Sequence, residues 1–281
     1  MHGVAVHFVV YDLLPVLIPE AFEPGTQDVH ANWLKAISEA DGAICISRSV
    51  ADELKQWVET QTPEASRRLK ISWFHLGANL QSASSRHEIT AVGSGAILRS
   101  IRSAPSFLMV GTIEPRKGHA QVLSAFEELW RAGQNVNLVI VGKQGWLVDS
   151  LAQYIHSHPE SGKRLFWLSD ASDSLLEELY NGSACLIAAS KGEGFGLPLI
   201  EAAHHRLPII ARDIPVFREV AKEHAFYFSG ADSQSLASSV GKWLELHDRN
   251  EHPQSAGLEH LSWNESAIEL MRVLLGSNGA R

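Results

Sequence analysis

Residues 105–142 decide the fold and read PSFLMVGTIEPRKGHAQVLSAFEELWRAGQNVNLVIVG. One continuous apolar run opens this stretch, a second closes it, and residues 121–131 between them are amphipathic with helical spacing. Apolar strands without polar alternation are typical of parallel sheets, whose two faces are covered by crossover helices. The stretch therefore predicts a βαβ unit in a parallel sheet.

The same rhythm continues to residue 246, and we assign residues 105–260 to one doubly wound, Rossmann-like α/β domain. Further apolar strands are expected at residues 164–170, 183–190, 207–213 and 225–228. Amphipathic helices are expected at residues 147–156, 175–180, 198–205, 216–223 and 234–246.

The first 80 residues show the same pattern in shorter form. Strand-like runs lie at residues 4–12, 42–47 and 68–75, and helices are expected at residues 31–40 and 49–57. A complete Rossmann-like sheet has about five or six strands. Residues 1–80 are therefore predicted to form an incomplete N-terminal lobe.

Two segments lie outside these lobes. Residues 81–104 are rich in Ser, Ala and Gly and have no period, which predicts a linker. Within the C-terminal segment 261–281, a helix at residues 265–275 has no strand after it to pair with, so we expect it to dock elsewhere, the first lobe being one candidate. Its apolar stripe consists of Ala267, Ile268, Met271, Leu274 and Leu275.

Composition excludes several classes of protein. The 281 residues, 45% of them hydrophobic, suit two domains, and the formal net charge of −8 does not favour nucleic acid as a partner. No run approaches the roughly 18 apolar residues of a membrane span, so a soluble protein is expected. Cys45 and Cys185 each lie inside a short apolar run, which predicts buried thiols, no disulfide and a reducing compartment.

A pair of adjacent cations follows the strand at residue 110. The turn TIEPRKGH contains Arg116 and Lys117, with Pro115 stiffening the chain and Gly118 opening the next helix. A planar guanidinium beside a point charge suits a diphosphate. An ordinary solvated basic turn is the alternative.

A second turn, KGEGFGLPLIE at residues 191–201, follows the strand at 183–190. Its three glycines let the backbone approach a ligand closely, and Pro198 stands in the first turn of a helix whose free amides attract anions. Ligands of open α/β sheets bind outside the carboxyl ends of the strands. We therefore expect the two turns to meet over one edge of the sheet.

Two carboxylates accompany the glycines. Glu193 and Glu201 are eight positions apart, so both can border one pocket without sharing a helical face. Carboxylates accept hydrogen bonds from vicinal hydroxyls of a ribose or a hexose. Alternatively, Glu193 is a surface charge of the loop and Glu201 a residue that interacts with the helix dipole.

Motifs of other enzyme classes are missing from the sequence. There is no G-x-G-x-x-G after a strand, which disfavours nicotinamide chemistry, and no G-x-x-x-x-G-K-[ST], G-x-S-x-G or H-E-x-x-H. Kinase, α/β-hydrolase and zincin functions therefore lose their support. His204 and His205 are adjacent on a helix and cannot face the same way, and no D-x-D pair occurs, so no metal site is expected.

The motif EGFGLPLIE with VGTIEPRKG upstream resembles the retaining GT-B glycosyltransferases of family 4, glycosyl transferases group 1. The resemblance extends to residues 9–20, 142–146, 211–220 and 262–267. It is strong for bacterial enzymes that build O-antigen and capsular polysaccharide, several of them mannosyltransferases. The resemblance implies an α/β fold of GT-B type, with a C-terminal Rossmann-like donor domain and an N-terminal acceptor-side lobe that is truncated here.

The resemblance also implies roles for individual residues. Arg116 and Lys117 would neutralise the donor diphosphate and Glu193 would bind hydroxyls of the transferred sugar, which makes these three the catalytic group. Glu201 would accept hydrogen bonds from the nucleotide ribose. The other implied substrate-binding positions are Gly194, Phe195, Gly196 and Leu197 through their backbone, Ser169 near the base, Gly111 and Asp12.

The implied activity is transfer of a hexose, preferentially mannose, from a GDP- or UDP-linked donor to a glycan or lipid-linked acceptor, with retention of configuration. The resemblance implies no cofactor and no metal, and a cytoplasmic location compatible with peripheral association at the inner face of the membrane. Many members carry a His before the Asp of the first-lobe strand, whereas Tyr11 precedes Asp12 here. Two alternatives remain: a catalytically incomplete nucleotide-sugar-binding fragment, and a phosphorylase, for which no lysine stands in a context that suggests a pyridoxal cofactor.

Overall fold

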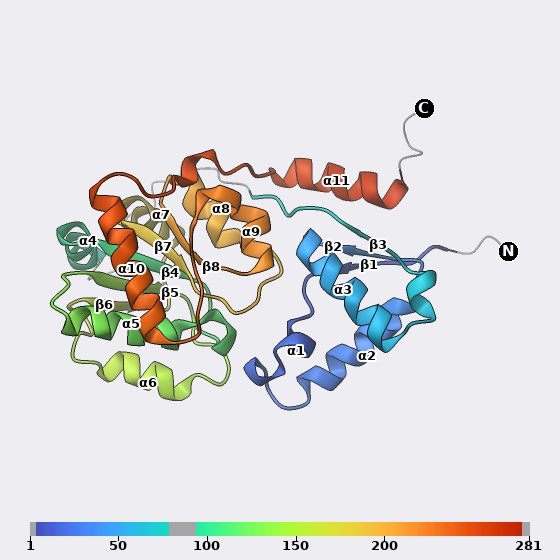
Figure 1. Cartoon of the computed structure of the whole chain (residues 1–281), viewed down its shortest axis with the longest axis horizontal. Coiled ribbons are helices and arrows are strands. Elements are labelled where there is room, and N and C mark those ends of the chain that lie inside the picture. Colours follow the sequence, from blue (N-terminus) through green and yellow to red (C-terminus); the bar gives the residue numbers. More distant parts are fainter. Residues whose placement is uncertain (1–3, 79–93, 277–281) are drawn as a thin grey trace.

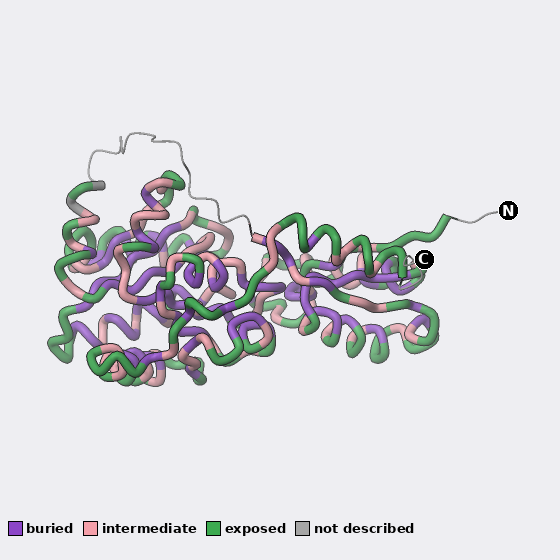
Figure 2. Tube along the Cα trace, turned by 90° about the horizontal axis from the view of Figure 1, so that it is seen from above, coloured by how far each residue is buried: buried purple, intermediate pink, exposed green. Residues whose placement is uncertain are grey.

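The chain folds into two lobes, each built on a parallel sheet (Figure 1). The computed structural model describes residues 4–78 and 94–276. Figure 2 shows the buried segments running through the middle of each lobe, with the exposed segments outside them. The α/β class predicted from the sequence is confirmed.

The second lobe contains a six-stranded sheet in the order β6-β5-β4-β7-β8-β9, and every strand pairs in parallel. Each apolar run of this region that predicts a strand forms one, because its side chains are covered on both faces of the sheet. The strands are β4 (Ser106–Val110), β5 (Asn137–Val141), β6 (Leu165–Leu168), β7 (Cys185–Ala188), β8 (Ile209–Arg212) and β9 (Phe226–Phe228).

Helices cover both faces of this sheet (Figure 1). On one face, α5 and α10 pack through Phe126 and Trp243, whose rings both meet Phe107 of β4 edge-on. On the other face, the core includes Leu179 of α7 and Leu199 of α8. The helices of this lobe after β4 are α5 (His119–Arg131), α6 (Asp149–Ser157), α7 (Asp173–Gly182), α8 (Leu197–His204), α9 (Pro215–Ala221) and α10 (Ser233–Asp248).

The strand order reverses between β4 and β7. These neighbours are the first and fourth strands of the lobe, and the chain leaves them toward opposite sides of the sheet. A crevice opens at such a switch point outside the carboxyl ends of the strands. Both turns singled out in the sequence begin there, one after β4 and the other after β7.

The first lobe has a three-stranded parallel sheet in the order β1-β2-β3. Its core joins β2 to the helices α2 and α3 through Ala43 and Cys45, whereas Ile44 faces the opposite side. The elements are β1 (His7–Val10), α1 (Leu14–Leu17), α2 (Thr26–Ser38), β2 (Gly42–Cys45), α3 (Arg48–Gln61) and β3 (Lys70–Trp73).

Helix α11 (Trp263–Leu275) returns to the first lobe and lies against β2 and β3 (Figure 1). A bridge between Gly77 and Leu261 starts this contact. The prediction of which face of this helix docks is wrong. Ile268 of the predicted stripe is 59% exposed, and the inward-facing side chains are Leu270 and Val273 instead.

The linker predicted at residues 81–104 needs a correction, because its last part is the helix α4 (Ser94–Ser103). Ile97, Leu98 and Ile101 share one face at helical spacing, and Ile101 is buried in the core beside α7. The surrounding Ser and Gly residues hide this short apolar face in the sequence. The other part of the predicted linker lies largely in residues 79–93, outside the described residues.

Two further expectations concern the cysteines and the membrane. Cys45 and Cys185 are both buried free thiols, so the predicted absence of a disulfide is confirmed. Burial, with a smaller contribution from Glu53, raises the pKa of Cys45 to about 12. Over residues 4–78 and 94–276, none of the helices has the length and apolar character that crossing a bilayer requires.

Candidate active site

The turn after β4, residues 112–118, is called the cation turn here, and the turn after β7, residues 191–196, the glycine-rich turn. The Lys191 amide donates a hydrogen bond to the Arg116 carbonyl at 2.8 Å. Gly118 adopts a φ of 77°, and a Cβ there would lie 2.4 Å from the Ala189 carbonyl oxygen. The expected meeting of the two turns over one sheet edge is confirmed.

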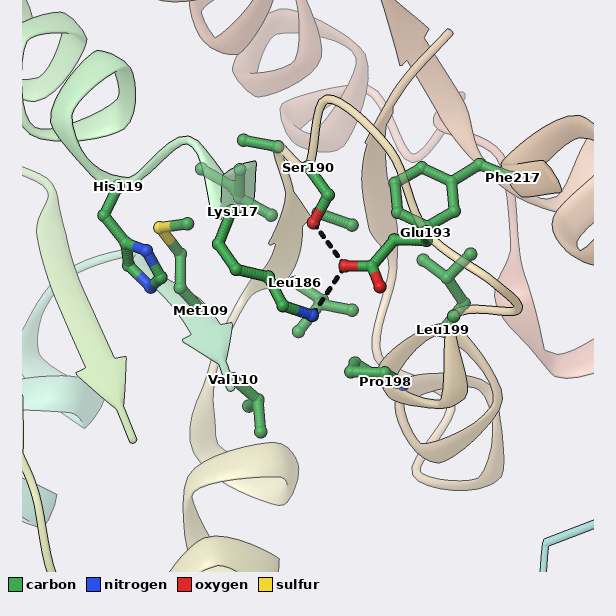
Figure 3. A pocket seen from close by; sticks show the side chains of 14 residues that line it. Met109, Val110, Lys117, His119, Leu186, Ser190, Glu193, Pro198, Leu199 and Phe217 are labelled. Carbon is green, nitrogen blue, oxygen red and sulfur yellow. Dashed lines mark hydrogen bonds and ion pairs between the residues drawn. The ribbon is translucent and has the colours of Figure 1, made fainter. Parts of the chain in front are cut away.

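Glu193 joins the two turns through its carboxylate. Lys117 Nζ lies 2.5 Å from Oε1 and Arg116 Nη1 lies 2.9 Å from Oε2. The Ser190 hydroxyl donates a third hydrogen bond, to Oε1 at 2.6 Å, and Figure 3 shows it converging with the Lys117 ammonium on this oxygen. The Glu193 side chain is only 12% exposed, so these groups satisfy a carboxylate that has little contact with water.

The charges of this cluster are balanced. Glu114 Oε2 lies 2.8 Å from Arg116 Nε, an ion pair without hydrogen-bond geometry, so two cations face two carboxylates. Burial raises the pKa of Glu193, but the charges of Lys117 and Arg116 and the hydrogen bonds from Lys117 and Ser190 outweigh burial and hold this pKa below its usual range. A diphosphate reaching the cations must compete with these carboxylates.

His119 is a buried neighbour of the cluster that sequence reasoning missed. It is the first residue of α5 and lines the same pocket as Met109, Lys117 and Glu193 (Figure 3). Burial and then the charge of Lys117 lower the pKa of His119 to about 4, so the imidazole is neutral near pH 7. Glu114 was missed as well: both residues stand in the quoted turn TIEPRKGH, but only their burial shows that they belong to the site.

The glycine-rich turn lies between the two lobes. A Cβ at Gly194 would be 2.1 Å from the Tyr11 carbonyl oxygen, and one at Gly192 would be 2.6 Å from a methyl group of Leu14. Gly196 adopts a φ of 104° and is followed by Leu197, the first residue of α8. The glycines therefore allow the β1–α1 segment of the first lobe to approach the site closely.

Glu201 stands apart from the Glu193 cluster. It lies inside α8 and accepts a hydrogen bond from the Tyr180 hydroxyl of α7 at 2.7 Å. The Tyr180 ring stacks on His205 with a centroid distance of 5.1 Å, which holds the phenol against α8. Tyr180 is 21 positions from Glu201 and was missed by sequence reasoning.

The structure places the remaining predicted residues at different distances from the cluster. Gly111 lies beside Lys117. Asp12, two residues after β1, is close enough for its charge to contribute to the raised pKa of Arg116, after the larger contributions of Glu193 and Glu114. Phe195 is buried with its ring 5.3 Å from that of His75, on the first-lobe side. Ser169 follows β6, which β5 separates from β4, so the structure does not bring it to the cluster.

Another contact between the lobes involves the GKQGW motif. Trp146 Nε1 donates a hydrogen bond to the Ala21 carbonyl at 2.9 Å, and its ring stacks on Phe22 with a centroid distance of 5.8 Å. The sequence alone predicted no contact for Trp146 or Phe22. In the described part of the chain, no group of three or more His, Cys, Asp or Glu side chains is arranged to hold a metal ion.

The chain is similar in sequence to known glycosyltransferases. The family model described as "Glycosyl transferases group 1" matches residues 98–260. The chain is 50% identical over 274 residues to the serotype-specific mannosyltransferase WbdA of Escherichia coli, covering 95% of this chain and 33% of that protein. It is 32% identical to the O-antigen chain mannosyltransferase RfbU of Salmonella typhimurium, covering 85% and 61%. The chain thus spans about a third of the length of WbdA.

Solved structures of low sequence identity share the fold. HepE of Anabaena, in complex with UDP and glucose, has a TM-score of 0.69 at 16% identity, covering 97% of this chain and 72% of that one. Sucrose-phosphate synthase of Thermosynechococcus elongatus has a TM-score of 0.73 at 20% identity, covering 98% and 68%. The expected GT-B architecture is confirmed at the level of the fold.

Proposed function

Because the chain belongs to the glycosyl transferases group 1 family, we propose that it is a glycosyltransferase that moves a hexose from a nucleoside-diphosphate sugar to a glycan or lipid-linked acceptor. Mannose is the proposed sugar, supported by the similarity to WbdA and RfbU, both named mannosyltransferases. The product would be a surface polysaccharide such as an O-antigen, made at the cytoplasmic face of the membrane.

The observation that carries this proposal is the junction of Arg116, Lys117 and Glu193 at the switch point of the sheet. When the glycosidic bond of the donor breaks, negative charge grows on the leaving diphosphate, and fixed cations aimed there lower the barrier. A carboxylate next to these cations can accept hydrogen bonds from the sugar hydroxyls. The cluster thus offers partners to the diphosphate and to the adjoining sugar.

The other predicted residues take the roles that the family resemblance implies. Glu201, held by Tyr180, would accept hydrogen bonds from the ribose, and Ser169 would lie near the base. Asp12, on the first lobe, would face the acceptor side. The backbone of Gly111, Gly194, Phe195, Gly196 and Leu197 would line the sugar and phosphates. By its family resemblance, the reaction would retain the anomeric configuration through front-face attack of the acceptor hydroxyl, without metal or cofactor.

The proposal is tested by incubating the full chain with GDP-mannose, UDP-glucose or UDP-galactose and a short mannose oligosaccharide. We expect transfer from GDP-mannose, and an NMR spectrum of the early product that shows the anomeric configuration of the donor. An inverted product would contradict the mechanism. If none of the donors gave transfer or hydrolysis, this result would contradict the enzymatic function.

A catalytically incomplete nucleotide-sugar-binding fragment is the second candidate. It is favoured by the first lobe, where the described chain forms a sheet of three strands and leaves Tyr11, at the end of β1, 60% exposed. Calorimetric titration with GDP, UDP and ADP separates the two functions. Nucleotide binding without hydrolysis or transfer would support the fragment.

As the proposed ribose ligand, Glu201 should contribute to the binding of every nucleotide or nucleoside with this sugar. We expect Glu201→Gln to weaken GDP binding roughly tenfold or more, because the amide replaces charge-assisted hydrogen bonds to the ribose worth about 1.5–3 kcal/mol. Calorimetry with GDP and guanosine measures the effect, which should be similar for both ligands. The control Tyr180→Phe keeps the carboxylate and should cost less. An unchanged dissociation constant would show that Glu201 is not a ribose ligand.

A further inference from the structure

The N-terminal turn of α3 belongs to the first lobe but is bonded to the glycine-rich turn of the second. Ser47 is the N-cap of α3, and its Oγ accepts a hydrogen bond from the Val50 amide at 3.1 Å. The same hydroxyl donates a hydrogen bond to the Gly194 carbonyl at 2.8 Å, across 147 positions of sequence. Ser47 is fully buried, so no water competes for this bond.

A carboxylate of the second lobe holds this turn of α3 in place. Glu219 of α9 accepts hydrogen bonds from the Arg48 and Ser49 amides at 2.8 Å each and from the Ser49 hydroxyl at 2.6 Å. It also contacts His75 Nε2 at 2.7 Å. A negative charge is favourable at a helix N-terminus, where the amides lack partners.

The ionisation of Glu219 fits this arrangement. Burial raises the pKa of Glu219, but the hydrogen bonds from His75, the Ser49 hydroxyl and the amides of Arg48 and Ser49 lower it to about 2. The carboxylate is therefore charged over the whole physiological range, and as an anion it fastens α3 to α9.

The glycine-rich turn is consequently held from both sides. Within the second lobe, the Lys191 amide bonds to the Arg116 carbonyl, and from the first lobe, Ser47 bonds to Gly194. Glu193 stands between these two attachment points. The position of its carboxylate relative to the cations therefore depends on the first lobe as well as on the second.

We infer that Ser47 is a positioning residue of the active site, which places Glu193 by bonding the glycine-rich turn to the first lobe, with Glu219 fixing Ser47 in turn. The part of this inference that concerns sugar binding rests on the proposed function, in which Glu193 binds the transferred hexose. The part that concerns the position of the turn rests on the contacts alone. A helix cap without this role would stabilise α3 and leave the turn unaffected.

Ser47→Gly separates the two roles, because glycine is also tolerated at an N-cap but has no hydroxyl to donate. We expect hydrogen–deuterium exchange of the full chain without ligand to be several-fold faster in Ser47→Gly than in the wild type in peptides covering residues 190–199. Asp232→Gly is the matched control, since Asp232 caps α10 by accepting from the Ser235 amide, on a helix of the second lobe that the α3 contacts do not involve. It should leave residues 190–199 unchanged. Glu219→Gln is the second variant and should act in the same direction as Ser47→Gly.

Steady-state kinetics with GDP-mannose, compared with calorimetric binding of GDP, provide the second measurement. Loss of one neutral hydrogen bond should lower the kcat/KM for GDP-mannose about three- to tenfold in Ser47→Gly, while the affinity for GDP, which lacks the sugar, should fall less. Equal losses for both ligands, or unchanged exchange at residues 190–199 in both Ser47→Gly and Glu219→Gln, would overturn the inference. If the wild type transfers no hexose, the proposed function fails, whereas the exchange measurement still decides whether Ser47 holds the turn.

Discussion

Lys117→Ala is expected to lower hexose transfer roughly 10²- to 10³-fold, the loss that follows removal of one fixed donor from a developing oxyanion. Lys117 carries a point charge that lies 2.5 Å from Glu193 and lines the pocket between β4 and β7. Alanine removes the positive charge that would stabilise the leaving diphosphate, and it also removes a partner of Glu193. Steady-state kinetics with GDP-mannose measure the effect.

The loss should depend on the phosphates of the ligand. GDP binding should weaken in Lys117→Ala, and more at low salt, where charges are screened less, while guanosine binding changes little. Lys163→Ala changes the net charge by the same amount at an exposed position before β6 and is the matched control. If GDP and guanosine lost affinity equally, Lys117 would not be a ligand of the diphosphate.

The sequence predicted the second lobe well because its information is local. Each strand there is a continuous apolar run that is covered on both faces, and the rule for switch points brings the ends of β4 and β7 together whatever the loops contain. Arg116, Lys117 and Glu193 could therefore be placed near one another. Their mutual ion pairing could not be predicted, because the same cations could equally have pointed into solvent.

The missed features depend on contacts between distant segments. Ser47 and Glu219 are an ordinary helix cap and an ordinary helix carboxylate in the sequence, and only the packing of the lobes brings α3 and α9 together over 171 positions. Tyr180 likewise gains its role from the packing of α7 against α8. The stripe of α11 was misassigned because apolar side chains at helical spacing do not show which face docks: Ile268 and Met271 remain exposed.

Glu193→Gln should separate transfer from binding more clearly than any other substitution. The carboxylate competes with a diphosphate for Arg116 and Lys117, so its neutral replacement leaves both cations available. We expect GDP to bind several-fold more tightly to Glu193→Gln than to the wild type. Hexose transfer should nevertheless fall roughly 10²-fold or more, because the sugar loses its charged acceptor and the cluster loses its geometry.

The same substitution should destabilise the second lobe at neutral pH. Removing one partner of a buried ion pair costs about 3 kcal/mol, because the remaining charges stay buried without compensation. The pKa of Glu193 is lower in the folded chain than in the unfolded one, so its stabilisation is present above the unfolded-state pKa and is lost as the pH falls through the folded-state pKa. The difference in unfolding free energy between wild type and Glu193→Gln should therefore shrink in acid, below the ordinary carboxyl range.

Glu178→Gln provides the matched control, because Glu178 pairs with Arg102 at 3.0 Å but is 42% exposed on the surface. Exposed pairs contribute little, so this variant should change the unfolding free energy by no more than about 0.5 kcal/mol, with no effect on GDP binding. Urea unfolding at several pH values and calorimetry with GDP test both variants together. If Glu193→Gln weakened GDP binding in parallel with transfer, the carboxylate would be a support for the cations and not their competitor, and its assignment to the sugar would lose its basis.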